Sequence, residues 1–140
     1  VKMAGEILQN NIGTVHWSVA GLTKNPTMLS NLKDGPYKAK ALVPTMNWIK
    51  TDKLSKPSLT VQKKTNEVVM SWNIKQANSN VSKWILYTRY NNDWETSIVQ
   101  STNTTSTISK FKNGKSLNAV ALKAVDRLGN ESDYIAEKIN

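Results

Sequence analysis

The feature that most constrains the fold is a series of short strand-like segments that fills the chain after Pro57. Each segment is rich in β-branched and aromatic residues, and clusters of Asn, Asp, Gly and Ser separate the segments. They span residues 58–63, 67–74, 83–90, 94–100, 104–111, 117–125 and 134–139. Seven short strands in about 85 residues, with turn residues between them, predict a mainly β domain, a small antiparallel β-sandwich.

Hydrophobic side chains alternate along several of these segments, as expected when one face of a strand is buried. We expect the two central tryptophans, Trp72 and Trp84, to belong to the core. The other residues expected to point inward are Val68, Met70, Ile74, Val120, Leu122 and Ala124.

A polar stretch, DRLGNES at residues 126–132, lies between the last two predicted strands. Asp126 at the first position of a type I turn can accept a bond from the turn backbone, and Gly129 at the fourth position tolerates a positive φ. We therefore predict a hairpin connection. Carboxylate and amide oxygens are also cation ligands, but the EF-hand spacing is absent, so we expect no metal here.

The first 55 residues follow a different pattern. Residues 2–10 have helical spacing, Thr14–Val19 is strand-like, and a second helix is expected from Pro26, with Asn25 as its cap. Its apolar stripe would be Met28, Leu29 and Leu32, and residues 37–49 read as extended. A single strand between two helices cannot pair its own backbone. We therefore interpret residues 1–55 as a remnant of a larger architecture and residues 56–140 as a separate sandwich.

Composition excludes several classes of function. The chain carries 19 basic and 10 acidic residues, a net charge of +9, but its basic residues are scattered with no run of three, so no nucleic-acid partner is predicted. With no cysteine there is no disulfide or thiolate metal site, and no cofactor is expected. No apolar run approaches the ~20 residues of a membrane span, so no transmembrane segment is predicted.

The second part resembles a bacterial fibronectin type III domain over residues 57–140. The resemblance is carried by Trp72, by the aromatic segment around Trp84 and Tyr87, and by the ending AVALKAVDRLGNES. One position departs from the family pattern. The tyrosine of the family's tyrosine corner would stand six residues before Ala124, where this chain has Asn118, so we expect that bond to be lost or replaced.

The first part resembles the C-terminal part of glycoside-hydrolase-like family ten, through GTVHWSVAGL and NPTMLSNLKDGPYKAKALVPTMNWI. This resemblance implies a bacterial envelope lipoprotein with a TIM barrel followed by a fibronectin-type tail. Residues 2–10 would end the seventh barrel helix, Thr14–Val19 would be the eighth strand, and residues 26–32 the eighth helix. The segment from Val43 to Pro57 would dock along the barrel, with Trp48 as its anchor.

Glycoside hydrolysis usually needs two facing carboxylates. The first part offers only Glu6, Asp34 and Asp52, none at the C-terminal end of a barrel strand, where such enzymes place their acids. We therefore expect this chain to be inactive by itself. His16 and Trp17 would lie at the barrel rim, where the indole could stack on a sugar. Core packing of the tryptophan and a structural role for the histidine are the alternatives.

Trp94 follows the turn signal Asn91-Asn92-Asp93 and should be exposed. With Tyr87 or Tyr90 it could form a flat carbohydrate platform, and edge-strand packing is the alternative. The sequence thus favours a non-catalytic accessory domain that supports or spaces the catalytic barrel of the same parent chain. A carbohydrate-binding module, with a polysaccharide or glycan as its partner, and a protein-interaction module of a cell-surface complex remain alternatives.

Overall fold

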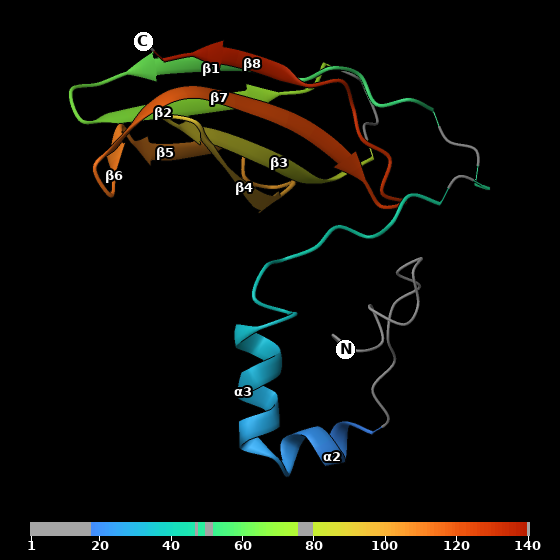
Figure 1. The fold of residues 1–140 in the computed structure, drawn as a ribbon. Helices are drawn as coiled ribbons and strands as arrows, with labels where there is room; N and C mark the ends of the chain where they lie inside the picture. The colour runs from blue at the N-terminus through green and yellow to red at the C-terminus, as the bar shows by residue number, and fades with distance from the viewer. Residues whose placement is uncertain (1–17, 47, 50–51, 76–79, 140) are drawn as a thin grey trace. The chain divides into compact units, whose positions relative to one another are not determined.

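The computed structural model describes residues 18–46, 48–49, 52–75 and 80–139. The chain divides into two compact units, residues 1–41 and 42–140 (Figure 1). No helix in the described ranges is both long and apolar enough to cross a membrane.

The described residues of the first unit contain two short helices, α2 (Val19–Thr23) and α3 (Pro26–Asp34). The start of α3 is as predicted. The Asn25 side chain accepts a hydrogen bond of 3.0 Å from the backbone N–H of Met28, and Pro26 occupies the first turn, where its missing N–H has no cost. The apolar stripe of this helix is largely in solvent, since Met28 is 44% and Leu29 36% exposed.

The predicted strand Thr14–Val19 is wrong where the structure describes it. Ser18 is the N-cap of α2, and Val19 is the first residue of that helix. The Ser18 carbonyl accepts from Gly21 N at 3.0 Å, a bond within the first helical turn, so Ser18 and Val19 are part of a helix start and not of a strand. Residues 14–17 and the predicted helix 2–10 lie outside the described residues, and no barrel strand is seen in the described part of this unit.

The second unit is built from two antiparallel sheets. One sheet has the order β1 (Ser58–Lys63), β2 (Glu67–Asn73) and β5 (Thr105–Ser109). The other has β4 (Asp93–Gln100), β3 (Val81–Tyr90) and β7 (Lys115–Asp126), and β7 also pairs with β6 (Phe111–Lys112) and β8 (Ile135–Lys138). The domain is therefore mainly β, and its order 1-2-5 against 4-3-7-8 is that of a fibronectin type III-like sandwich.

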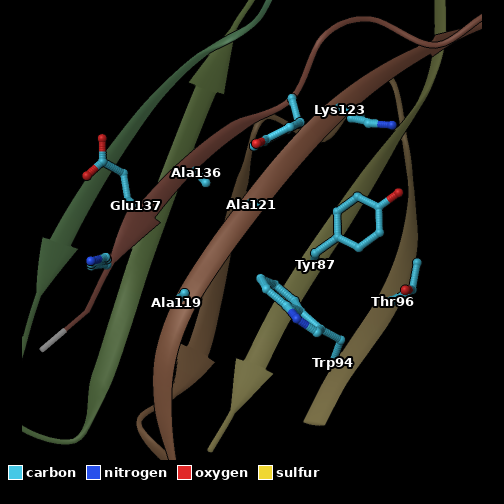
Figure 2. A pocket seen from close by; sticks show the side chains of 10 residues that line it. Tyr87, Trp94, Thr96, Ala119, Ala121, Lys123, Ala136 and Glu137 are labelled. Carbon is cyan, nitrogen blue, oxygen red and sulfur yellow. The ribbon is translucent and has the colours of Figure 1, made fainter. Parts of the chain in front are cut away.

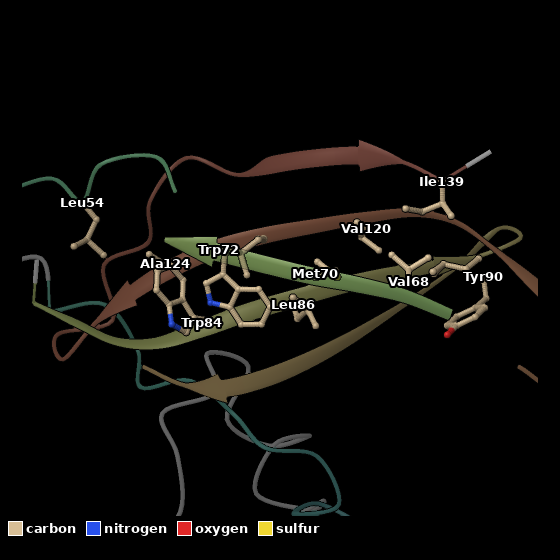
Figure 3. Packing of buried hydrophobic residues seen from close by; sticks show 12 residues of the cluster. Leu54, Val68, Met70, Trp72, Trp84, Leu86, Tyr90, Val120, Ala124 and Ile139 are labelled. Atoms are coloured by element: carbon tan, nitrogen blue, oxygen red, sulfur yellow. The ribbon is translucent and has the colours of Figure 1, made fainter. Parts of the chain in front are cut away.

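The core lies between the two sheets, as predicted (Figure 3). Trp72 from β2 and Trp84 from β3 meet edge to face, with their ring centroids 6.2 Å apart and an interplanar angle of 65°. The fully buried side chains around them include Val68, Met70, Val120, Leu122 and Ala124. Ile74 is only partly buried, at the margin of this cluster.

A β-bulge in β7 alters the inward pattern at its start. Arg89 is paired with Ala119 but Tyr90 with Leu117, so Asn118 is the extra residue. Leu117 and Val120 can therefore both be buried, at 4% and 0% exposure, although they are three residues apart. The Asn118 side chain, at the position where the resembled family has its corner tyrosine, donates to Asn91 O at 3.4 Å, a bond to the turn after β3.

The segment predicted as one strand, residues 104–111, is two strands in different sheets. Strand β5 ends at Ser109, and β6 begins at Phe111. Between them Lys110 bonds both sheets, since its N–H donates to Asn66 O and its C=O accepts from Leu117 N, at 2.9 and 2.8 Å. Ile108 packs against the core, whereas Phe111 is 62% exposed.

The second unit begins at Leu42, earlier than the expected boundary after residue 55. Residues between Leu42 and the expected boundary belong to the second unit in part because of Leu54. This residue is 5% exposed and belongs to the core cluster of the sandwich. Trp48, which we expected to anchor the segment against a barrel, is 79% exposed. Residues 42–55, below called the incoming segment, are thus partly integrated into the sandwich.

Candidate functional sites: a fastening loop and an aromatic groove

The stretch DRLGNES (residues 126–132) connects β7 to β8, as predicted, and Asp126 organises it. This residue is 8% exposed. One carboxylate oxygen accepts from the backbone N–H groups of Leu128 and Asn130, at 2.8 and 2.9 Å, and the other accepts from Asn130 Nδ2 at 2.8 Å. Both oxygens are engaged by the loop itself. Within the described ranges, no group of three acidic or histidine side chains could hold a metal ion.

The end of this loop is closed back onto β7 by Ser132, which is 4% exposed. Its hydroxyl accepts from Ala124 N at 2.9 Å and donates to Asp133 O at 2.9 Å. Its backbone N–H donates to Ala124 O at 2.9 Å. The polar residues of DRLGNES therefore build a rigid loop.

This loop also holds the incoming segment. Met46 N donates to Leu128 O at 3.0 Å, and the Thr45 hydroxyl donates to Gly129 O at 3.1 Å. Gly129 has φ +82°, and a Cβ at this position would lie 2.5 Å from Val43 O. Only glycine combines this backbone conformation with such a close approach of another chain segment. We call residues 126–132 the fastening loop.

Lysines, four of them exposed and Lys123 partly buried, hold several carboxylates of the sandwich. The pairs are Lys53–Asp133, Lys64–Glu67, Lys112–Glu95, Lys115–Asp93 and Lys123–Glu131. The hydrogen bond that Lys123 donates to the Glu131 carboxylate is the main cause that raises the pKa of Lys123, and the bond that Lys112 donates to Glu95 does the same for the pKa of Lys112. Such surface pairs contribute little stability and leave each of these carboxylates with a cation beside it.

A groove of about 690 Å³ lies on the outer face of the β4-β3-β7-β8 sheet (Figure 2). Its residues are Tyr87, Trp94, Thr96, Ala119, Ala121, Lys123, Tyr134, Ala136, Glu137 and Lys138. We call it the aromatic groove.

The register of the strands explains why these residues meet. Across the sheet, one row of paired residues runs through Thr96, Tyr87, Ala121 and Ala136. The next row, two residues along each strand, runs through Trp94, Arg89, Ala119 and Lys138. Aromatic side chains stand on β3 and β4, whereas alanines on β7 and β8 leave the sheet flat beside them.

Trp94 is 53% exposed, as its position after a turn predicts. The guanidinium carbon of Arg89 lies 6.0 Å from the centroid of its ring. Arg89 is in turn held by bonds from Nε to Asn91 O and from Nη2 to Asn92 Oδ1, at 3.0 and 3.2 Å. The indole is therefore positioned by a cation–π contact whose cation is itself fixed.

The predicted partners of Trp94 separate. Tyr87 lines the groove with it, whereas Tyr90 faces the core, is 5% exposed and donates to Ser109 O at 2.8 Å. His16 and Trp17 lie outside the described residues. Sequence reasoning missed Tyr134 and the alanine floor, although the outward alternation of Ala119 and Ala121 was visible in the sequence.

No protein-family model and no curated protein sequence matches the chain. Among solved structures it is similar to the spore cortex lytic enzyme SleM of Clostridium perfringens, at TM-score 0.48 and 15% identity over 62% of this chain. It is also similar to pectate lyase PelI of Erwinia chrysanthemi, at TM-score 0.44 and 15% identity over 58% of this chain. The chain spans only 28% of the length of each.

A third similar structure is an isolated FN3 domain of human collagen XX, with a TM-score of 0.46 and 15% identity. The match covers 71% of this chain and 100% of that domain. Because these likenesses are distant, the assignment of the fold depends on the strand order and the core described above.

Proposed function

We propose that this chain carries a non-catalytic accessory domain of a larger, carbohydrate-active bacterial envelope protein. Its sandwich would fix the chain segment that enters it and so support or space a catalytic barrel in the same parent chain. The resemblance of residues 13–49 to glycoside-hydrolase-like family ten supports the parent, and the fibronectin type III-like fold supports the accessory role.

The observation that carries this proposal is the attachment of the incoming segment to the fastening loop. A spacer transmits orientation only if the chain is held where it enters the domain. Here two hydrogen bonds, Met46 N to Leu128 O and Thr45 Oγ1 to Gly129 O, join residues more than 80 positions apart. Leu54 then inserts into the core, so the segment is held at two places.

Amide hydrogen exchange tests this role. We expect the Met46 amide to be protected to a degree approaching that of core amides in β7, such as Leu122, because both are released by opening of the same unit. In the Gly129→Ala variant, Met46 should lose protection while Leu122 keeps it. Exchange of Met46 at the rate of an unstructured peptide in the wild-type chain would contradict the structural role.

The non-catalytic part of the proposal has its own assay. Turnover of aryl glycosides and of peptidoglycan fragments by the chain should equal the buffer blank. Measurable turnover that purifies with the protein would instead make it an enzyme.

A further inference from the structure

We propose that the aromatic groove is a binding site for an acidic polysaccharide, in which a sugar ring stacks on Trp94 and Tyr87 and acidic groups of the polymer meet the surrounding cations. This inference goes beyond the supporting role proposed above and does not depend on it.

The shape of the groove fits a pyranose ring. The C–H face of a sugar is flat and apolar, and it associates with the face of an aromatic ring. Trp94 and Tyr87 supply such rings from neighbouring strands, and the methyl groups of Ala119, Ala121 and Ala136 form a floor that does not obstruct a long, thin ligand. Tyr134, 62% exposed, adds a third aromatic side chain to the lining.

The exposure of these aromatics needs an explanation. Burial of a large aromatic side chain would stabilise the fold, yet Trp94, the second residue of strand β4, is 53% exposed. Trp94 is not part of the core cluster, and its ring instead has the guanidinium of Arg89 at 6.0 Å from its centroid. An exposed apolar patch with a polar rim is typical of a binding surface, and a pre-positioned side chain loses less entropy when a ligand arrives.

Charge selects an acidic ligand over a neutral one. Lys123 and Lys138 line the groove, Arg89 lies beside Trp94, and Glu137 is the one acidic residue in the lining. Lys123 is paired with Glu131 at 2.8 Å, which offsets its charge, so the attraction to an acidic ligand comes mainly from Lys138 and Arg89. The whole chain carries a net charge of +9, so long-range attraction has the same sign.

Size favours a glycan over a protein partner. The volume of about 690 Å³ falls within the range of small-ligand clefts, roughly 300–1,000 Å³. A stable protein interface would need about 800 Å² from each partner, which a groove of ten lining residues does not offer by itself.

Affinity electrophoresis of the whole chain tests the site, with alginate and hyaluronan as acidic probes and hydroxyethylcellulose and xyloglucan as neutral ones. We expect retardation by an acidic polymer and none by the neutral polymers.

Variants of the groove residues test which side chains bind the polymer. Trp94→Ala should weaken binding by about tenfold or more, as loss of a central aromatic contact does. Tyr134 is 62% exposed and is not part of the core cluster, so Tyr134→Ala should also weaken polymer binding without destabilising the fold. Lys138→Gln should weaken it and reduce its salt dependence.

Two matched controls separate the groove from general basic charge. Lys56→Gln removes one exposed lysine away from the groove, and Phe111→Ala removes an equally exposed aromatic from β6. Both should bind like the wild-type chain, with unchanged thermal midpoints.

The proposal is overturned if no acidic polymer binds, if neutral polymers bind equally, or if Trp94→Ala and Tyr134→Ala are both retarded like the wild type. A dimer in sedimentation that Trp94→Ala dissolves, without glycan binding, would assign the groove to a second copy instead.

Discussion

Single residues decide how the fastening loop works, and glycine is the most demanding of them. Gly129 and Gly114 both have positive φ, +82° and +74°, so a side chain at either position strains the backbone. They differ in their surroundings. A Cβ at Gly114 would meet nothing within 4 Å, whereas one at Gly129 would lie 2.5 Å from Val43 O. Gly114 is therefore a natural control for Gly129.

We expect Gly114→Ala to lower the free energy of unfolding by about 1 kcal/mol, the cost of a left-handed L-residue. Gly129→Ala should cost roughly 1–3 kcal/mol more, because the incoming segment must also move. Urea denaturation followed by tryptophan fluorescence measures both. Equal losses in the two variants would mean that the close approach to Val43 has no energetic weight.

A second comparison at this scale uses the two core tryptophans. Trp84 Nε1 donates to Ser101 O at 3.3 Å, whereas in the described residues Trp72 Nε1 has no acceptor. Replacement by phenylalanine removes the same atoms in both cases. Trp84→Phe should therefore be the more destabilising, by about 1 kcal/mol, since it also leaves the Ser101 carbonyl without its donor. The same denaturation series decides this, and a larger loss in Trp72→Phe would contradict it.

Among the secondary-structure elements, the two sheets are joined by more than hydrophobic contact. The Tyr90 hydroxyl, on β3, donates to Ser109 O, on β5 of the other sheet, at 2.8 Å. Burial, and to a lesser degree the charge of Glu95, raises the pKa of the Tyr90 phenol. The folded state thus keeps this proton more firmly than the unfolded chain does. The stability that the protonated Tyr90 phenol contributes is therefore complete below the pKa of tyrosine in the unfolded chain, about 10. It is lost as the pH rises through the higher pKa of Tyr90 in the folded state.

Comparison of the wild-type chain with Tyr90→Phe isolates this contribution. Near neutral pH the variant should be less stable by about 1 kcal/mol, because it lacks the inter-sheet bond. Above about pH 10 the difference should shrink, since only the wild type has a buried phenol to ionise. Denaturant titrations at several pH values measure the difference. If it stays constant to about pH 11, the raised pKa is not linked to folding.

For the whole molecule, the question is where the independently stable domain begins. The compact unit begins at Leu42, and Leu54 supplies part of its core. We expect a fragment of residues 42–140 to unfold in one cooperative transition. A fragment of residues 56–140 should be less stable by about 2–5 kcal/mol, because it loses Leu54 as well as the bonds to the fastening loop.

Leu54→Ala in the longer fragment provides the control, since it removes the core contact but keeps the bonds of Thr45 and Met46. Its stability should fall between those of the two fragments. Identical unfolding curves for residues 42–140 and 56–140 would place the start of the domain at residue 56, as the sequence alone suggested.

The sequence by itself determined the strands and much of the core. Alternation depends on the side-chain period of a strand, which is local, so β1, β2 and β7 were found within one or two residues of their ends. Turn chemistry is equally local, which is why the connection at Asp126 and the cap at Asn25 were predicted correctly. The exposure of Trp94 followed from its place after a turn.

Only the tertiary structure decided what depends on contacts between distant segments. The bulge at Asn118 exists because β7 must match β3, and the chain changes sheets at Lys110 because both sheets offer it a partner there. Val19 is helical although it is β-branched and follows the strand-like stretch TVHWS in the sequence, since a strand is stable only where a neighbouring strand pairs with it. The aromatic groove likewise depends on register, which places Tyr87 and Trp94 beside alanines more than 20 residues away. Local rules fix which residues form strands, but the pairing of those strands fixes which side chains meet.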